Sequence, residues 1–288
     1  MQSRYYLRYV FWTAVLISII PSLTNTACAQ SLNLEGQSGG LATPFAYTLE
    51  SKPNRISFPA AAFHLLNGGD VVGTHFQVSL AVGFLNRVEA GFTRSAVSEG
   101  SCEPLSNLFD RGFSIIHGKA ALVLEGTGNA NMPAISAGVL ARYQRGHIEG
   151  GLGAATQNGD IFVTATKTIN RIEQAPVILS GGLKATNASI MGLAGNSPSW
   201  DLCGFAFAGV NVGGLVLVGA EYAQQPREIE DFENADVSGI VTFLVRLTPD
   251  DKARLAVEAG VISLGDVIGP GLEVKADSRY FFGVGYRF

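Results

Sequence analysis

The chain has 288 residues, with 20 Lys and Arg against 24 Asp and Glu, so its formal net charge at pH 7 is −4. This acidic balance argues against a nucleic-acid-binding protein. Apolar residues make up 47% of the chain and charged residues only 15%, which excludes an intrinsically disordered protein. The 35 glycines follow no fixed period and there are only three cysteines, so the chain is neither collagen-like nor a disulfide scaffold.

Residues 1–29 have the three-part pattern of a secretory signal peptide. Two arginines give a basic start, Val10 to Ile20 is an apolar run, and a polar stretch ends at Ala27-Cys28-Ala29. The small residues at its end predict cleavage before Gln30, which leaves residues 30–288 as the mature domain. An uncleaved anchor is an alternative, but the apolar run is shorter than the ~20 residues of a spanning helix. Lipoprotein processing at Cys28 is disfavoured because Asn25 stands where it requires a leucine.

The mature chain alternates between apolar and small or polar residues, with the period of two that is typical of a β-strand. In 72–84 the even positions are Val, Thr, Phe, Val, Leu, Val and Phe, whereas the odd positions are Gly, His, Gln, Ser, Ala and Gly. The same period recurs in 133–143, 241–247 and 255–261. A soluble β-sandwich also alternates. Here, however, the second face consists of Gly, Ala, Ser and single charges, which is typical of the crowded inside of a tube.

Residues 202–220 contain no charge and have the length of a membrane-spanning helix. Five glycines and Asn211 argue against that helix, and the Gly213-Gly214 pair is a turn signal. We therefore expect a β-hairpin, with arms at 203–211 and 215–222.

Twelve strands are predicted for the whole chain, although ten or fourteen would also be compatible with the pattern. Their expected ranges are 41–50, 72–85, 87–97, 112–124, 133–145, 161–169, 176–185, 203–211, 215–223, 238–248, 253–264 and 279–288. The connections between them alternate between long and short, beginning with a long one at 51–71. This alternation is typical of a transmembrane antiparallel β-barrel, in which short turns face the periplasm and long loops face the outside. The expected fold is therefore an all-β transmembrane barrel with both termini in the periplasm.

The last strand carries an aromatic pattern. Its apolar face consists of Tyr280, Phe282, Val284, Tyr286 and the terminal Phe288. This segment resembles the terminal strand of bacterial outer-membrane β-barrel, porin-like proteins, which the barrel-assembly machinery of that family recognises. The resemblance implies a location in the outer membrane of a Gram-negative bacterium. It also implies outer-membrane lipids and the assembly machinery as partners; the oligomeric state stays open.

The phase of the strands assigns a polar set to the inside of the barrel. These candidate lumen-lining residues are His75, Gln77, Glu89, Lys119, Arg142, Lys184, Asn211, Glu221, Arg246, Arg254, Glu258 and Arg287. Two interpretations remain: a polar channel whose charges select solutes, or salt bridges that fill a narrow barrel.

Motifs for catalysis or metal binding are weak, and we expect neither an enzyme nor a cofactor. None of the four histidines has a serine two residues away, as the twelve-stranded outer-membrane phospholipase requires. Residues 36–40 spell G-x-S-x-G, but no strand precedes them and no helix follows, so a flexible entry to the first strand is expected. The acidic stretch 224–237 could bind a divalent cation, but it lacks EF-hand spacing and a solvated loop is the simpler interpretation.

Cys102 and Cys203 are predicted on the same side of the membrane and could form a disulfide, or stay as two separate thiols. The predicted function is a passive pore for small hydrophilic solutes. The alternative is a non-conducting barrel with a structural, adhesive or envelope-assembly role.

Overall fold

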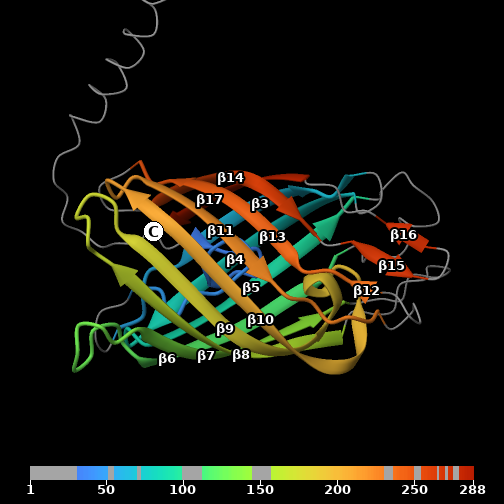
Figure 1. The fold of residues 1–288 in the computed structure, drawn as a ribbon, viewed down its shortest axis with the longest axis horizontal. Helices are drawn as coiled ribbons and strands as arrows, with labels where there is room; N and C mark the ends of the chain where they lie inside the picture. Colours follow the sequence, from blue (N-terminus) through green and yellow to red (C-terminus); the bar gives the residue numbers. More distant parts are fainter. Residues whose placement is uncertain are drawn as a thin grey trace, which may run out of the picture.

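A computed structural model describes residues 31–50, 55–69, 73–98, 112–144, 157–229, 236–249, 254–264, 266–269, 272–274 and 279–288. Twelve antiparallel strands form a closed barrel, in which each strand pairs with its neighbours and the last pairs with the first (Figure 1). The barrel strands are β3 (Ala60–Asn67), β4 (Thr74–Phe84), β5 (Val88–Val97), β6 (Ser114–Val123), β7 (Ala134–Tyr143), β8 (Gln157–Ile169), β9 (Val177–Ala188), β10 (Asn196–Val212), β11 (Val216–Ala223), β13 (Ile240–Leu247), β14 (Leu255–Ser263) and β17 (Arg279–Arg287). The fold class and the strand number predicted from the sequence are confirmed.

The predicted first strand, 41–50, is wrong. This segment lies inside the barrel, and the first barrel strand is β3, in the stretch that was expected to be a long loop. Residues 41–49 alternate like a strand, but almost all of them are buried on both sides. The sequence of β3, Ala-Ala-Ala-Phe-His-Leu-Leu-Asn, contrasts its two faces weakly, because alanines stand on both.

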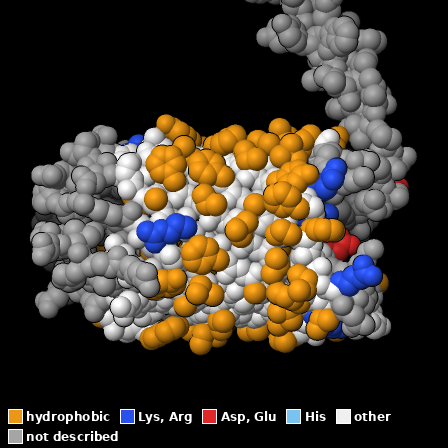
Figure 2. Space-filling view, turned by 180° about the vertical axis from the view of Figure 1, so that it is seen from behind, with side chains coloured by type: hydrophobic (Ala, Val, Ile, Leu, Met, Phe, Trp, Pro, Cys, Tyr) orange, Lys and Arg blue, Asp and Glu red, His pale blue; other side chains and the backbone are white. Residues whose placement is uncertain are grey.

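The outer surface of the barrel is apolar. Strand β4 shows the rule: Phe76, Val78 and Leu80 are exposed, whereas Gln77 and Ser79 are buried. Figure 2 shows hydrophobic side chains spread over the barrel wall. A closed barrel leaves no unpaired strand edge, and an apolar exterior of this kind suits contact with lipid.

The predicted hairpin around residue 213 is confirmed. β10 and β11 pair from Phe205–Ala223 to Val212–Val216, and Gly213 and Gly214 adopt φ of 60° and 72°. Both angles lie in the left-handed region that a glycine tolerates without strain. The uncharged run 202–220 is thus two strands.

The remaining elements are short. β1 (Ser31–Leu32) and β2 (Ser38–Gly39) pair with each other inside the barrel. A 3₁₀ segment, η2 (Ser189–Gly192), connects β9 to β10, and β12 (Asp236–Val237), β15 (Val267–Gly269) and β16 (Leu272–Val274) form a small sheet beyond one end of the barrel. No helix in the described ranges is long and apolar enough to cross a membrane.

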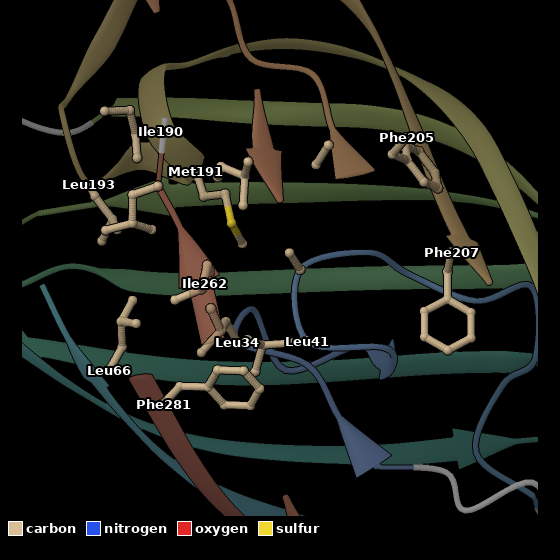
Figure 3. Packing of buried hydrophobic residues seen from close by; sticks show 14 of the residues in the cluster. Leu34, Leu41, Leu66, Ile190, Met191, Leu193, Phe205, Phe207, Ile262 and Phe281 are labelled. Atoms are coloured by element: carbon tan, nitrogen blue, oxygen red, sulfur yellow. The ribbon is translucent and has the colours of Figure 1, made fainter. Parts of the chain in front are cut away.

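The hydrophobic core lies within the barrel. Leu34 and Leu41 from the N-terminal segment pack with Ile190, Met191 and Leu193 from the β9–β10 connection. Inward-facing wall residues complete the cluster, among them Leu66, Phe205, Phe207, Ile262 and Phe281 (Figure 3). The interior is therefore packed like the core of a soluble protein.

Candidate functional site

Residues 31–49, which we call the plug, fill the lumen. All of them are buried except Tyr47, which is half-buried. The plug enters and leaves at the end of the barrel that carries Phe288, which we call the C-terminal end: Ser31 lies next to Gly285, and Leu49 lies against Gly83. Both glycines belong to the ends of their strands at this side.

Tight turns shape the plug. The side chain of Asn33 accepts hydrogen bonds from the amides of Glu35 and Gln37, at 3.0 and 2.9 Å. Gly36 has a φ of +87°, in the left-handed region that favours glycine. Asn and Gly are the residues that turns of this kind select, so the sequence Asn-Leu-Glu-Gly folds back on itself.

Two charged wall residues bind residues 39–42, which we call the tip of the plug. Glu221 accepts hydrogen bonds from the amides of Leu41 and Ala42, at 2.5 and 2.7 Å. Arg246 donates to the carbonyls of Gly39 and Gly40, both at 3.1 Å. These side chains are at most 3% exposed, so their hydrogen-bond partners are protein groups.

Arg246 also joins an ion network on the lumen wall. Its Nε lies 2.7 Å from Glu258, and the other carboxylate oxygen of Glu258 lies 2.8 Å from His64 Nε2. Gly283 stands between these strands, where a β-carbon would lie 2.6 Å from His64 and 2.8 Å from Glu258. The glycine therefore gives the histidine room to reach the glutamate.

A second anchor forms around Ser38. Its amide and hydroxyl both donate to Glu89, at 2.9 and 2.6 Å, and Lys119 donates to its carbonyl at 3.0 Å. Lys119 also donates to the carbonyl of Phe45, at 3.0 Å, and Glu89 accepts from the amide of Leu49, at 2.9 Å. Glu89 and Lys119 thus connect the plug around Ser38 to its final part, Phe45 to Leu49.

A third anchor is the cluster around Arg142. The guanidinium forms ion pairs with Glu35 of the plug and with Asp160 of β8, the latter at 2.8 Å. It also donates to Asn158 at 3.2 Å. Gly192 of η2 lies against the same side chain, since a β-carbon there would meet Arg142 Cδ at 2.6 Å. Arg142 therefore connects the plug, the wall and the β9–β10 connection.

Hydroxyl groups make the remaining contacts. The amide of Ala46 donates to Thr166 at 2.7 Å, the carbonyl of Ala46 accepts from Ser136, and Thr164 donates to the carbonyl of Pro44 at 3.2 Å. These residues belong to β7 and β8, so the plug is held on several sides.

The β9–β10 connection closes the lumen from the opposite end. Ile190 is 1% exposed and Met191 5% exposed. Both have positive φ, 48° and 56°, which is uncommon for such residues and is held here by packing. The amide of Met191 donates to Gln225 at 3.1 Å, and Ser189 donates to the carbonyl of Glu228 at 2.9 Å. Plug and connection meet in one apolar cluster.

The structure buries ten of the candidate lumen-lining residues on the inward side of their strands, each at most 7% exposed. They are His75, Gln77, Glu89, Lys119, Arg142, Lys184, Asn211, Glu221, Arg246 and Glu258. Arg254 is exposed and precedes β14, and Arg287 lies at the rim, 3.7 Å from Glu50. These two do not line the lumen interior. Whether the others line a conducting pore stays a prediction.

The sequence analysis did not identify the acidic partners of the basic side chains in the lumen. The predicted set held six basic and three acidic residues, an imbalance that signals missing carboxylates because buried charges need partners. Glu35 and Asp160 supply two of them. Glu35 precedes the predicted first strand, and Asp160 precedes the predicted start of the sixth, so neither was assigned a face.

Three weaker candidates have different outcomes. Ser38 of the G-x-S-x-G sequence lies within the plug rather than in a flexible entry, so that expectation is wrong. Cys203 is a buried free thiol in the described part of the chain. Cys102 lies outside the described residues, so the disulfide between the two stays a prediction. Glu230, Asp231 and Glu233 of the acidic stretch 224–237 also lie outside them. Within the described part of the chain, no three His, Cys, Asp or Glu side chains are grouped to hold a metal.

The outward aromatic residues of the last strand are placed as expected. Tyr280 and Phe288 are 61% and 60% exposed, and Phe282 and Tyr286 are also exposed. The amide of Phe288 donates to the carbonyl of Pro59 at 3.1 Å, next to the start of β3. The terminal aromatic therefore marks the seam where the barrel closes.

A cavity of about 760 Å³ lies at the C-terminal end, between the β6–β7 and β8–β9 turns. Tyr47 of the plug forms part of its lining, with Glu125, Asn131, Lys167, Thr168 and Arg171 among the others. The Tyr47 hydroxyl donates to Glu125 at 2.5 Å and lies 2.8 Å from the Thr168 hydroxyl. This polar vestibule ends at the plug. Deeper in the lumen, the void between the plug and β8–β11 measures only about 10 Å³, about the space of one water.

Comparison with known proteins gives a family match. The sequence matches the model described as "Protein of unknown function (DUF3034)" over residues 28–276. No curated protein matches the chain.

Similar solved structures share little sequence with the chain. The KdgM porin in complex with disordered oligogalacturonate has a TM-score of 0.49 and 9% identity, covering 80% of this chain and 99% of the porin. The COG4313 outer membrane channel from Pseudomonas putida F1 has a TM-score of 0.48 and 11% identity, covering 83% and 97%. The NanC porin has a TM-score of 0.44 and 10% identity, covering 80% and 98%.

The protein is a closed β-barrel with an apolar outer surface, the architecture of a bacterial outer-membrane protein. Because the family model covers most of its length, the chain belongs to the DUF3034 family.

Proposed function

We propose that the protein is an outer-membrane pore for small hydrophilic solutes that its own N-terminal segment closes at rest. The observation that carries this proposal is the placement of residues 31–49 in the lumen. A pore that stays open at all times would be less compatible with this filled interior. With the C-terminal end in the periplasm, the plug would withdraw to that side.

The chemistry of the wall favours a pore over a permanently solid barrel. Among the described residues, the buried charged side chains are Lys119, Arg142, Lys184, Arg246, Glu35, Glu89, Asp160, Glu221 and Glu258. Buried ion pairs stabilise a protein no better than apolar residues of similar volume. An interior needed only for stability could be wholly apolar. Charges on the wall, in contrast, would be hydrated once the plug leaves.

A non-conducting barrel is the second candidate. It is favoured by the apolar cluster that joins the plug, the β9–β10 connection and the wall. In that case the plug would be a permanent part of the core, and the protein would have a structural role. The Ser38 hydroxyl is bonded to Glu89 and Lys119 deep in the lumen, and neither candidate function uses it as a nucleophile.

Planar-bilayer recordings of Gly40→Val test the proposal. A β-carbon at position 40 would lie 1.7 Å from Glu221 Oε1, and that carboxylate is held by two amides of the plug. The variant should therefore unseat the plug without changing the wall. Gly118→Val is the matched control, because a β-carbon there has a single neighbour, at 4.0 Å.

We expect long closed periods in the unmodified protein and in Gly118→Val, but frequent discrete conductance steps in Gly40→Val. Gly36→Val/Gly40→Val serves as a second variant, because valine is also strained at the positive φ of residue 36. Electrical silence in both folded variants would support the non-conducting candidate. Equal conductance in all proteins would show that the plug does not close the lumen.

A further inference from the structure

The lumen wall contacts the plug mainly through the main chain of the plug. Glu89, Glu221 and Thr166 accept hydrogen bonds from its amides, and Lys119, Arg246, Ser136 and Thr164 donate to its carbonyls. The amides are those of Ser38, Leu41, Ala42, Ala46 and Leu49, and the carbonyls are those of Ser38, Gly39, Gly40, Pro44, Phe45 and Ala46. Because every peptide carries the same amides and carbonyls, such contacts recognise a peptide largely independently of its sequence.

We propose that the lumen is a binding site for a peptide that folds back on itself as the plug does, and that short peptides rich in small side chains are the solutes that the open barrel takes up. This inference rests on the proposed function, because the plug must leave before another peptide can enter.

Glu221 and Arg246 together match three successive peptide units of the plug, between residues 39 and 42. The two oxygens of Glu221 take the amides of the neighbouring residues 41 and 42. Two nitrogens of Arg246 take the carbonyls of the neighbouring residues 39 and 40. A carboxylate can only accept and a guanidinium can only donate. This pairing suits the fixed donors and acceptors of a peptide better than sugar hydroxyls, which can do both.

The space around the plug restricts side-chain size. Gly40 leaves no room for a β-carbon beside Glu221, and Ala42 and Ala46 are 5% and 1% exposed. Larger apolar residues are accommodated where the interior offers apolar partners: Leu41 is 0% exposed, and Phe45 packs against Phe207 with ring centroids 4.8 Å apart. A suitable peptide therefore has Gly or Ala at these three positions and apolar anchors at the positions of Leu41 and Phe45.

The paired charges of the lumen wall do not require a charged peptide. Lys119 lies 3.4 Å from Glu89, and Arg246 is paired with Glu258. Because these wall charges neutralise one another in pairs, an uncharged peptide segment is accepted, as residues 38–49 of the plug are.

The test uses the full-length Gly36→Val/Gly40→Val protein, whose wall is unaltered, and a synthetic peptide of residues 31–49 added at the C-terminal side. We expect the peptide to reduce the ionic current in a concentration-dependent manner. Replacing the amides of residues 41 and 42 by esters removes both donors to Glu221 and should weaken the block at least about tenfold, since hydrogen bonds to charged groups are the strong ones. Thr43→Val in the peptide is the matched control, because the Thr43 hydroxyl has no hydrogen-bond partner.

An unrelated peptide rich in Gly and Ala, with one Leu and one Phe at the matching spacing, should also block, more weakly than the plug peptide. An ester peptide that blocks as well as the amide would overturn main-chain recognition. Block by maltotriose, with no effect of either peptide, would overturn the inference in favour of a saccharide. If the variant is folded but silent, the proposed function fails. Fluorescence titration with a dye-labelled plug peptide then decides the inference separately: saturable binding supports it and absence of binding overturns it.

Discussion

Phe45 of the plug packs against Phe207 of β10, with ring centroids 4.8 Å apart and ring planes inclined by 60°. The two residues are 162 positions apart in the sequence, and both rings are almost fully buried. Tilted aromatic pairs contribute about 0.5–1.5 kcal/mol beyond the burial of their surface. The contact lies where an open pore would contain water, so it links the N-terminal segment directly to the closed state.

Arg142→Met should destabilise the barrel strongly. The change leaves Glu35 and Asp160 buried without their cation, and breaking a buried ion pair costs about 3–5 kcal/mol. Urea titration of the refolded protein measures this loss. Arg254→Met, at an exposed arginine, is the control and should stay within about 0.5 kcal/mol. Equal midpoints for both variants would show that the Arg142 cluster does not hold the plug.

Phe243→Arg tests the contact of β13 with lipid. Phe243 is 61% exposed on the outer surface near the middle of its strand. Arginine at the bilayer midplane of such barrels costs about 2–4 kcal/mol, so this variant should unfold at lower urea than Phe243→Leu. Identical unfolding of the two variants in lipid vesicles would mean that this face does not contact the membrane core.

The filled lumen changes the expectation for the neighbouring position. In an open pore, Thr242→Arg would extend into water at little cost. Thr242 is instead 0% exposed and faces the packed interior. We therefore expect Thr242→Arg to lower the amount of folded protein at least as much as Phe243→Arg, measured by heat-modifiable migration on gels. Tolerance of Thr242→Arg alone would indicate an open lumen at this level.

Deleting Phe288 should impair assembly in the outer membrane. Its ring is 60% exposed and stacks edge-on against Tyr286, 5.0 Å away. Aromatic residues of this kind sit at the membrane interface, and the terminal aromatic is the proposed recognition signal for the assembly machinery. The amount of folded protein in outer-membrane fractions is the measurement. Replacement by Tyr or Trp should preserve it, and an unchanged amount after deletion would refute the assembly role.

The strands of the barrel wall could be predicted because each has one face toward lipid and one toward the interior. This contrast is clear in β4, where Phe76, Val78 and Leu80 alternate with buried polar residues. It is weak in β3, where small residues fill both faces. A period of two reveals a strand only where its two sides meet different surroundings.

The plug could not be predicted for the same reason. Leu41, Phe45 and Leu49 recur like the apolar face of a strand, yet the segment turns back on itself and is surrounded by protein. The lumen charges were located from strand phase, but several of their partners are main-chain groups of this segment. Contacts such as the hydrogen bond from the amide of Leu41 to Glu221 join residues 180 positions apart. No local sequence pattern predicts such contacts.

Photo-cross-linking from position 45 tests the central claim, that residues 31–49 occupy the lumen, most directly. A photoreactive benzoylphenylalanine replaces Phe45 in the protein assembled in outer membranes, and cross-linked peptides are identified by mass spectrometry after irradiation. Because Phe45 packs on Phe207, the account predicts that position 45 is joined to the β10 peptide containing residues 205–212 of the same chain. Cross-links to lipid or to other proteins, with none to the barrel wall, would contradict it.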